Sequence, residues 1–284
     1  SARALPDKPA LRWRTGRSPD GRASYDELTF AQLDQLTDRY AWGLQAAGVC
    51  PGMRVLLMVR ISPDFPALTF ALFKTGAVPV LIDPGMGILA FTRCVRDVEP
   101  GGVVGIPPAH LLRLGFRRSF RSVRVPVTLG RRWFWGGVST AEFPSCPDPF
   151  QTTKVKPDEL AAVLFTSGST GPAKGVAYTH PIFASQIEIL KGEFGIGPEN
   201  VDLPCFPLFG LFSTGLGVTA VLPEMDPTRP ARVDPARIVE VVTDNDVTYS
   251  FGSPALWETV SRHCAREAIE LPRLKRVFMA GAPA

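Results

Sequence analysis

The sequence predicts an α/β fold in which mostly parallel sheets are surrounded by helices. Helix-like and strand-like segments alternate along the first part of the chain, the connections are short, and the strand-like segments are unbroken apolar runs. Central strands of parallel sheets are buried on both faces and therefore have this continuous apolar pattern. With 284 residues, 45% of them hydrophobic and 20% charged, the composition is that of a folded globular protein.

The individual elements follow from periodicity and from turn residues. Helical spacing of apolar residues marks the expected helices, and short runs rich in β-branched residues mark the expected strands. Asp234-Pro235 adds a start signal, because aspartate caps backbone N–H groups and proline suits the first helical turn. The expected helices are residues 28–47, 66–75, 181–194, 235–244 and 254–268. The expected strands are residues 54–60, 78–82, 103–106, 125–129, 160–165, 247–251 and 276–280.

A proline-rich stretch at residues 139–157 shows little periodicity and indicates a surface crossing between two parts of the chain. We therefore expect a first α/β subdomain at residues 1–151 and a second at residues 152–284.

Cysteine, histidine and apolar patterns narrow the class of protein. The five cysteines lie more than forty residues apart without a CxxC pair, which argues against a zinc site or disulfide framework and favours a reducing cytoplasm. The three histidines have no metal-binding spacing, so we expect no resident metal site. The longest apolar stretch, residues 65–82, is interrupted by Lys74, Gly76 and Pro79, so we expect no transmembrane segment.

Charge is unevenly distributed around residues 113–132. No acidic residue lies between Glu99 and Glu142, whereas seven arginines do: Arg113, Arg117, Arg118, Arg121, Arg124, Arg131 and Arg132. The simple interpretation is a solvated helix and loop face. The alternative is a docking surface for a partner protein, an anionic substrate carrier or a membrane face. The net charge is only +4 and no nucleic-acid-binding module is recognisable, so we expect no nucleic acid partner.

The feature that bears most on function is a glycine-rich loop. It reads Thr166, Ser167, Gly168, Ser169, Thr170, Gly171, Pro172, Ala173, Lys174 and Gly175. Glycines at 168, 171 and 175 permit positive φ and close approach of the backbone to phosphate, the hydroxyls add donors, and Lys174 supplies positive charge. A flexible linker is the alternative, but we expect the loop to lie directly between a strand and a helix. It is not a Walker A loop, because Ala173 and Gly175 stand where that pattern has glycine and serine or threonine.

These residues resemble the signature TSGSTGxPKG of the adenylate-forming superfamily, with proline one place early. Residues 28–33 and 72–84 are similar to two further family segments, and Ala280-Gly281-Ala282-Pro283 to the segment that lies against adenine. The resemblance implies the large N-terminal domain of that fold, with ATP and Mg²⁺ as cofactors. It implies that ATP is bound by Thr166, Ser167, Gly168, Ser169, Thr170, Gly171, Lys174, Gly175, Gly281, Ala282 and Pro283. The chemistry implied is attack of a carboxylate on the α-phosphorus with release of pyrophosphate.

The nucleophile of the second step depends on other residues. Acyl-CoA synthetases of the family have histidine where this chain has Gly210, after Pro207-Leu208-Phe209. The sequence of residues 206–217 and 251–257 is similar to that of the β-lactone synthetases of olefin biosynthesis. This implies a long-chain β-hydroxy acid substrate whose own hydroxyl closes the ring. The expected substrate pocket comprises Phe209, Gly210, Leu211, Phe251, Gly252 and Ser253. An acyl-CoA synthetase, a fatty acyl-AMP ligase and a non-catalytic nucleotide-binding scaffold remain alternatives, as does core packing for the aromatic residues.

Lys174 and His180 are the expected catalytic residues, although a histidine that starts a helix more often caps or packs. Asp83 is better explained as a turn residue at a strand end, and His110 and His263 as structural residues. The residues end at Ala284, before the family's C-terminal lid, so we expect that lid and its lysine to be absent from them and the second subdomain to be incomplete.

Overall fold

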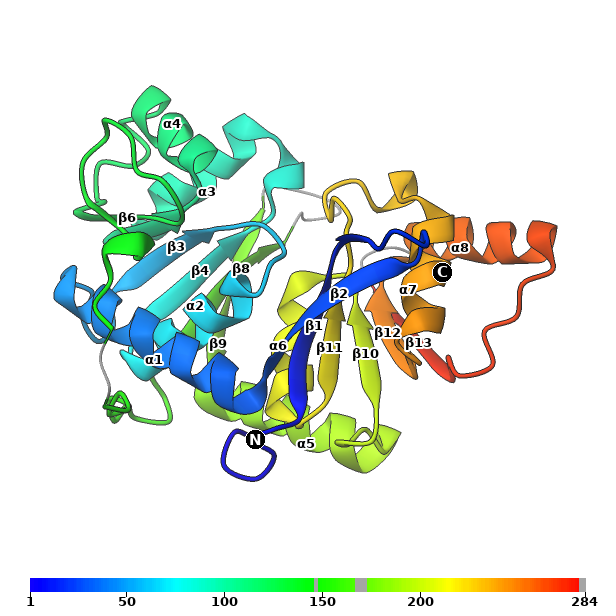
Figure 1. Ribbon diagram of the computed structural model, residues 1–284. Coiled ribbons are helices and arrows are strands. Elements are labelled where there is room, and N and C mark those ends of the chain that lie inside the picture. The colour runs from blue at the N-terminus through cyan, green and yellow to red at the C-terminus, as the bar shows by residue number, and fades with distance from the viewer. Residues whose placement is uncertain (146–147, 167–172, 281–284) are drawn as a thin grey trace. The chain divides into compact units, whose positions relative to one another are not determined.

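The computed structural model describes residues 1–145, 148–166 and 173–280, which form two compact units (Figure 1). The first unit comprises Ser1–Asp34, Ile61–Pro63 and Gln186–Ala284, and the second comprises Gln35–Arg60 and Asp64–Ser185. This division differs from a boundary near residue 152. The reason is that sheet pairing joins strands distant in sequence, and this pairing brings residues from both ends of the chain into one unit.

The second unit is built on a seven-stranded sheet with the order β7-β6-β5-β3-β4-β8-β9. Its strands are β3 (Arg54–Met58), β4 (Val78–Ile82), β5 (Gly102–Gly105), β6 (Val125–Thr128), β7 (Val138–Ser139), β8 (Leu160–Thr166) and β9 (Lys174–Thr179). All neighbours pair in parallel except β8 and β9. The connecting helices are α2 (Asp64–Lys74), α3 (Ile88–Val98) and α4 (Pro107–Gly115). The mostly parallel α/β architecture predicted from the sequence is therefore confirmed.

The first unit is built on a six-stranded sheet with the order β13-β12-β10-β11-β1-β2. Its strands are β1 (Pro9–Arg17), β2 (Ala23–Thr29), β10 (Val201–Pro204), β11 (Thr219–Leu222), β12 (Tyr249–Gly252) and β13 (Arg276–Met279). Only β2 is antiparallel to its neighbour. The helices between its strands are α6 (Gly210–Gly215), α7 (Pro235–Asp244) and α8 (Pro254–Glu267). Two further helices, α1 (Phe30–Ala46) and α5 (His180–Phe194), continue from one unit into the other.

Two hydrophobic clusters define the two faces of the six-stranded sheet. On one face, α7 and α8 pack against Leu203 of β10 and Val221 of β11. Tyr249 of β12 belongs to a separate cluster with Ile196 and Val218. Successive strand residues point to opposite faces, so the residues beside Leu203 point away from α7 and α8. Asp202, Tyr249 and Phe251 point toward this second face.

Local side-chain caps explain several helix starts. Thr29 and Gln32 form reciprocal hydrogen bonds with each other's backbone N–H groups at the start of α1, at 3.2 and 2.8 Å. Asp83 accepts a hydrogen bond from the Gly85 N–H at 2.7 Å and caps the short 3₁₀ helix Pro84–Met86, which confirms its turn role. Asp234 accepts from the Ala236 N–H at 3.1 Å, which confirms the predicted start of α7.

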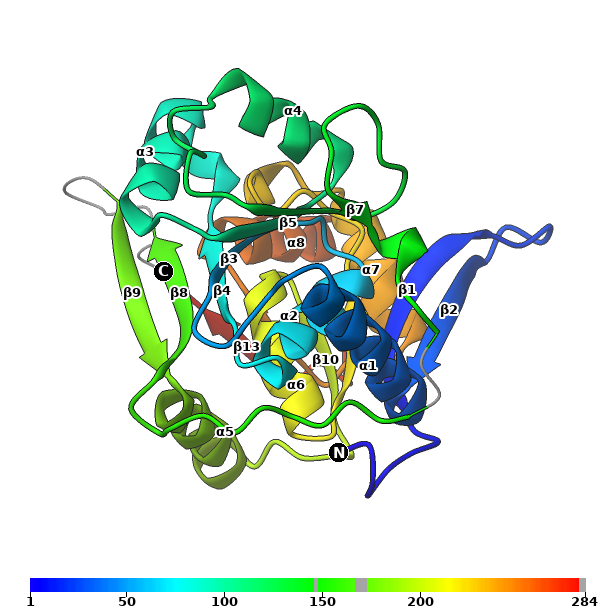
Figure 2. The ribbon, with the colours of Figure 1, turned by 90° about the vertical axis from the view of Figure 1, so that its left-hand side faces the viewer.

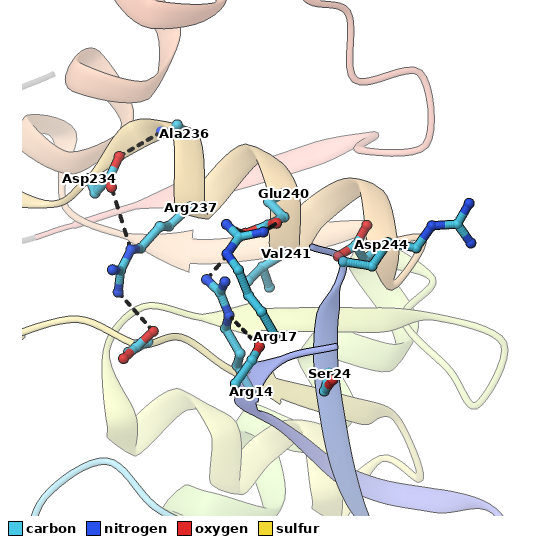
Figure 3. A network of polar contacts seen from close by, with 12 residues as sticks. Arg14, Arg17, Ser24, Asp234, Ala236, Arg237, Glu240, Val241 and Asp244 are labelled. Carbon is cyan, nitrogen blue, oxygen red and sulfur yellow. Dashed lines mark hydrogen bonds and ion pairs between the residues drawn. The ribbon is translucent and has the colours of Figure 1, made fainter. Parts of the chain in front are cut away.

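Polar contacts hold the β1–β2 ribbon against α7 (Figure 3). Arg14 and Arg17 of β1 both bind the carboxylate of Glu240, at 3.2 and 2.9 Å. Tyr25 of β2 donates its hydroxyl hydrogen to Asp244 at 3.0 Å, and burial raises the pKa of that tyrosine. The Arg14 side chain is only 8% exposed, so the ion pairs that it forms are screened less than surface pairs.

Candidate active site

The ends of the glycine-rich loop are held by an antiparallel hairpin. Thr166 is the last residue of β8, Lys174 is the first of β9, and the two are register partners (Figure 2). Ser167, Gly168, Ser169, Thr170 and Gly171 lie outside the described residues, as does Pro172. A strand, rather than a helix, therefore follows the loop, and the expected strand–loop–helix arrangement is wrong. The hairpin supports the rejection of a Walker A loop, which opens directly into a helix.

Gly175 has a packing role rather than the expected conformational one. It does not adopt positive φ, and a Cβ placed on it would lie 3.0 Å from the ring of Phe165, its register partner across the hairpin. Phe165 and Ala173 both pack against the core cluster of the seven-stranded sheet. The hairpin thus anchors the loop through its apolar side chains and needs glycine at residue 175 for space.

Lys174 is exposed at the start of β9, and its ammonium has no hydrogen bond or ion pair with any residue that the structure describes. His180 begins α5, and its ring lies 6.2 Å from that of Phe73 in α2, at an interplanar angle of 67°. This edge-on contact accounts for His180 as a packing residue, and its catalytic role stays a prediction. His110 is fully buried, bonds through Nε2 to the Val127 carbonyl at 3.0 Å, and has the structural role expected of it.

The residues expected to line an acyl pocket come from two parts of the first unit, the start of α6 and the end of β12. Phe209 lies just before α6, Phe251 lies in β12, and their rings stack with centroids 3.4 Å apart at 15°. Phe206 and Phe212 each lie 5.9 Å from Phe209, centroid to centroid. Leu211, 6% exposed, follows in α6. These contacts bring two of the predicted pocket residues, Phe209 and Phe251, into one aromatic cluster with Phe206 and Phe212.

Gly210 and Gly252 are both positions where a side chain would meet a neighbour. A Cβ on Gly210 would lie 3.2 Å from Cγ of Pro204 in β10, so the histidine found there in acyl-CoA synthetases would press on this proline. A Cβ on Gly252 would lie 2.9 Å from Nε1 of Trp257. Ser253 accepts a hydrogen bond from the Leu256 N–H at 3.3 Å and caps α8, which gives it a structural function.

Both candidate regions lie at the carboxyl ends of parallel strands. The glycine-rich loop follows β8, which runs parallel to β4. The predicted pocket residues lie at the end of β12 or after the ends of β10 and β12, which run parallel to each other. Open α/β sheets bind ligands at this edge, because the loops after the strands converge there. Gly281, Ala282 and Pro283 follow β13 and lie outside the described residues.

A buried polar network beneath α6 was missed by sequence reasoning. Asp202 of β10 is 1% exposed and accepts a hydrogen bond from the Ser213 hydroxyl of α6 at 2.5 Å. The same hydroxyl lies 3.1 Å from the Tyr249 hydroxyl. Oδ1 of Asp202 has no hydrogen-bond partner in the described parts of the chain. The signal in the sequence was an acidic residue inside the apolar run Val201–Pro204.

Burial determines the electrostatics of this network. It raises the pKa of Asp202 to about 8, and the hydrogen bond from Ser213 only partly offsets this effect. Burial and the neighbouring Asp202 also raise the pKa of Tyr249. The network fixes α6, and with it the residues that begin this helix, onto β10 and β12.

Neither a metal-binding cluster nor a membrane span emerges from the described residues. No group of three or more His, Cys, Asp or Glu side chains in them is placed to bind a metal ion. None of the helices in these residues combines the length and apolar character needed to cross a bilayer.

Comparison with known proteins places the chain in a family. Residues 1–284 match the family described as AMP-binding enzyme. Olefin beta-lactone synthetases from Xanthomonas campestris pv. campestris and Stenotrophomonas maltophilia are each 44% identical to this chain over 99% of its length. The chain covers 50% and 51% of those proteins and thus spans about half the length of these curated relatives.

Solved structures give the same fold. A long-chain-fatty-acid–CoA ligase from Archaeoglobus fulgidus superimposes with a TM-score of 0.83, covering 99% of this chain and 56% of that chain, at 21% identity. At that identity the likeness shows the fold alone. Because the family match extends over every residue and the glycine-rich loop follows a parallel strand at the ligand-binding edge, this chain belongs to the AMP-binding enzyme family of adenylate-forming proteins.

Proposed function

We propose that the complete protein containing this chain uses ATP to convert a long-chain β-hydroxy acid into a β-lactone. A carboxylate oxygen of the acid bonds to the α-phosphorus, and the bond from that phosphorus to the bridging oxygen breaks, which releases pyrophosphate. The β-hydroxyl oxygen then bonds to the acyl carbon, its proton passes to a base, and AMP leaves with the electron pair of the broken acyl–phosphate bond.

One observation carries this proposal: the 44% identity with two olefin beta-lactone synthetases over 99% of the chain. The residue at position 210 supports it, because this chain has glycine where acyl-CoA synthetases have histidine. The stacked rings of Phe209 and Phe251 supply apolar surface suited to an alkyl chain.

In this proposal the residues around the hairpin grip ATP. Lys174 and the hydroxyls of Thr166, Ser167, Ser169 and Thr170 bind phosphate oxygens, and Gly168 and Gly171 allow the backbone to approach. Gly281, Ala282 and Pro283 lie against adenine. Mg²⁺ would arrive with the nucleotide, since the described residues offer no cluster that would bind it alone, and it would neutralise phosphate charge.

The first prediction concerns coenzyme A. The complete protein, given ATP and a 3-hydroxy fatty acid, is expected to consume the acid and release AMP without coenzyme A, because the nucleophile is the substrate's own hydroxyl. Chromatographic measurement of acid and AMP checks this. The matched control is the fatty acid of equal length without the hydroxyl, which should support ATP–pyrophosphate exchange but little AMP release. Consumption of the hydroxy acid only after coenzyme A is added would instead identify an acyl-CoA synthetase.

The second prediction concerns the phosphate grip. Lys174→Ala should lower ATP–pyrophosphate exchange by about ten- to a hundredfold, because a charge-assisted hydrogen bond of roughly 1.5 to 3 kcal/mol is lost. Lys191→Ala, which removes an exposed lysine of α5, is the control and should leave exchange unchanged. Equal exchange in both variants would show that Lys174 does not contribute to phosphate binding. No exchange by the unmodified protein with any acid tested would favour a nucleotide-binding scaffold.

Location and partners are part of the proposal. Cys50, Cys94, Cys205 and Cys264 are free thiols, which supports a reducing compartment such as the cytoplasm. We also propose that the arginine-rich segment 113–132 is a docking surface. The aromatic residues at its end indicate what binds there.

A further inference from the structure

The arginine-rich segment divides into arginines that stabilise the fold and arginines that do not. Arg113 donates to the Trp135 carbonyl at 3.1 Å, and Arg121 and Arg132 pair with Glu99 and Glu142, each at 3.3 Å. Four others are exposed and form no ion pair with any residue in the described ranges: Arg117, Arg118, Arg124 and Arg131. Seven of the chain's 31 basic residues and none of its 27 acidic residues lie in this segment, so the remainder carries a net negative charge.

Two large aromatic side chains are exposed in the connection between β6 and β7. Trp133 is 52% and Phe134 is 75% exposed. Single exposed apolar residues are common, but adjacent exposed tryptophan and phenylalanine side chains beside unpaired arginines form a distinct surface. We call Arg117, Arg118, Arg131, Trp133 and Phe134 the aromatic–arginine surface.

A buried tryptophan anchors these two aromatic residues. Trp135 is 7% exposed, donates from Nε1 to the Thr128 hydroxyl at 2.9 Å, and stacks on His110 at 5.3 Å and 14°. The rings of Trp133 and Phe134 lie 5.3 and 5.5 Å from that of Trp135. Their exposure is thus supported by a fixed platform.

Arg113 contacts the same anchor, and three unpaired arginines lie close in sequence to Arg113 or to Trp133. Arg113, near the end of α4, bonds to the Trp135 carbonyl, and Arg117 and Arg118 follow Arg113 by only four and five residues. Arg131 precedes Trp133 by two residues. Positive charge and exposed aromatic rings are therefore combined in one region of the second unit.

We propose that the aromatic–arginine surface binds the surface of an anionic lipid bilayer. Tryptophan and phenylalanine insert at the boundary between headgroups and acyl chains, and arginine attracts lipid phosphate. A protein partner is held in register by complementary charges, commonly of both signs, whereas this segment offers one sign over its whole length. A lipid surface requires only positive charge and insertable apolar side chains. The inference is independent of the proposed reaction.

The experiment is co-sedimentation of the complete protein with vesicles of phosphatidylcholine, with or without phosphatidylglycerol. We expect binding to the anionic vesicles only, with an affinity that falls as salt rises. Both Arg117→Gln/Arg118→Gln and Trp133→Ser/Phe134→Ser should lower that affinity by at least about tenfold. Two matched controls should bind normally. Leu89→Ser removes a different exposed apolar side chain, which is 78% exposed, and Arg262→Gln removes an exposed arginine of α8.

Fluorescence distinguishes insertion from simple attraction. Vesicles should shift the tryptophan emission to shorter wavelength, and Trp133→Phe should abolish most of the shift while it retains binding. An unchanged melting temperature verifies folding of the exposed-site variants. No binding to anionic vesicles, equal binding to phosphatidylcholine alone, or normal binding by Trp133→Ser/Phe134→Ser would overturn the proposal. The absence of binding to anionic vesicles would favour a protein as the partner of this surface.

Discussion

Replacing Asp202 by asparagine is expected to abolish the loss of stability that this carboxyl causes as the pH rises from about 4 to about 8. The pKa of the folded carboxyl is raised by burial from 3.8 to about 8, so the folded state favours the neutral form. Below about pH 4 the carboxyl is neutral in both states, and its contribution to stability is fully present. As pH rises to about 8, the unfolded chain ionises first and folding becomes less favourable, by an amount on the order of a few kcal/mol.

Urea denaturation of the wild type and of Asp202→Asn at several pH values measures this effect. The asparagine side chain does not titrate, and its amide oxygen can still accept the hydrogen bond from Ser213. The variant should therefore show a flatter pH dependence and a higher midpoint above pH 8. Asp97→Asn, which removes a carboxylate of α3 that is 60% exposed, should keep the wild-type slope. Parallel curves for wild type and Asp202→Asn would show that Asp202 is ionised in the folded protein.

Gly137→Ala is expected to lower the free energy of unfolding by about 3 kcal/mol. Gly137 precedes β7 at φ +79°, and a Cβ there would lie 2.1 Å from the carbonyl oxygen of Pro126 in β6. The substitution therefore carries the cost of the left-handed conformation and also the cost of separating β7 from β6.

Gly136 provides a matched control for this prediction. Its φ is +73°, but nothing lies within 4 Å of a Cβ placed there. Gly136→Ala should cost only about 1 kcal/mol, the conformational part alone. Chemical denaturation gives both free energies, and hydrogen exchange of β6 and β7 amides locates the loss. Equal midpoints for the two variants would contradict the proposed clash with Pro126.

Features controlled by nearby residues could be predicted from the sequence. The strand Val78–Ile82 and the starts of α7 and α8 were expected where they occur, because apolar runs, capping residues and proline act over a few positions. Phe209 and Phe251 were assigned to one substrate pocket through resemblance alone, and that assignment stays a prediction, although their rings do stack. Periodicity does not show that these two residues meet.

Features that depend on pairing between distant segments could not be predicted. The β1–β2 ribbon was missed, and its pairing with β11 is what draws the start of the chain into the unit that holds residues 186–284. β9 was missed because the sequence of Lys174–Thr179 has no clear strand pattern of its own. These residues form a strand by pairing with β8. The packing of Gly175 against Phe165 was missed because nothing in the sequence places Phe165 opposite it, and the expected phosphate contact of Gly175 stays a prediction.

The sequence by itself determined the α/β class, the local caps and the phosphate-loop signature, since each depends on residues close together along the chain. Only the tertiary structure decided that a hairpin frames this loop, that Gly210 lies against Pro204, and that Asp202 is buried beside Ser213 and Tyr249. The physical reason is that burial and close approach are properties of segments brought together by folding. Neither the environment of a carboxyl nor the space beside a glycine is encoded in its immediate neighbours.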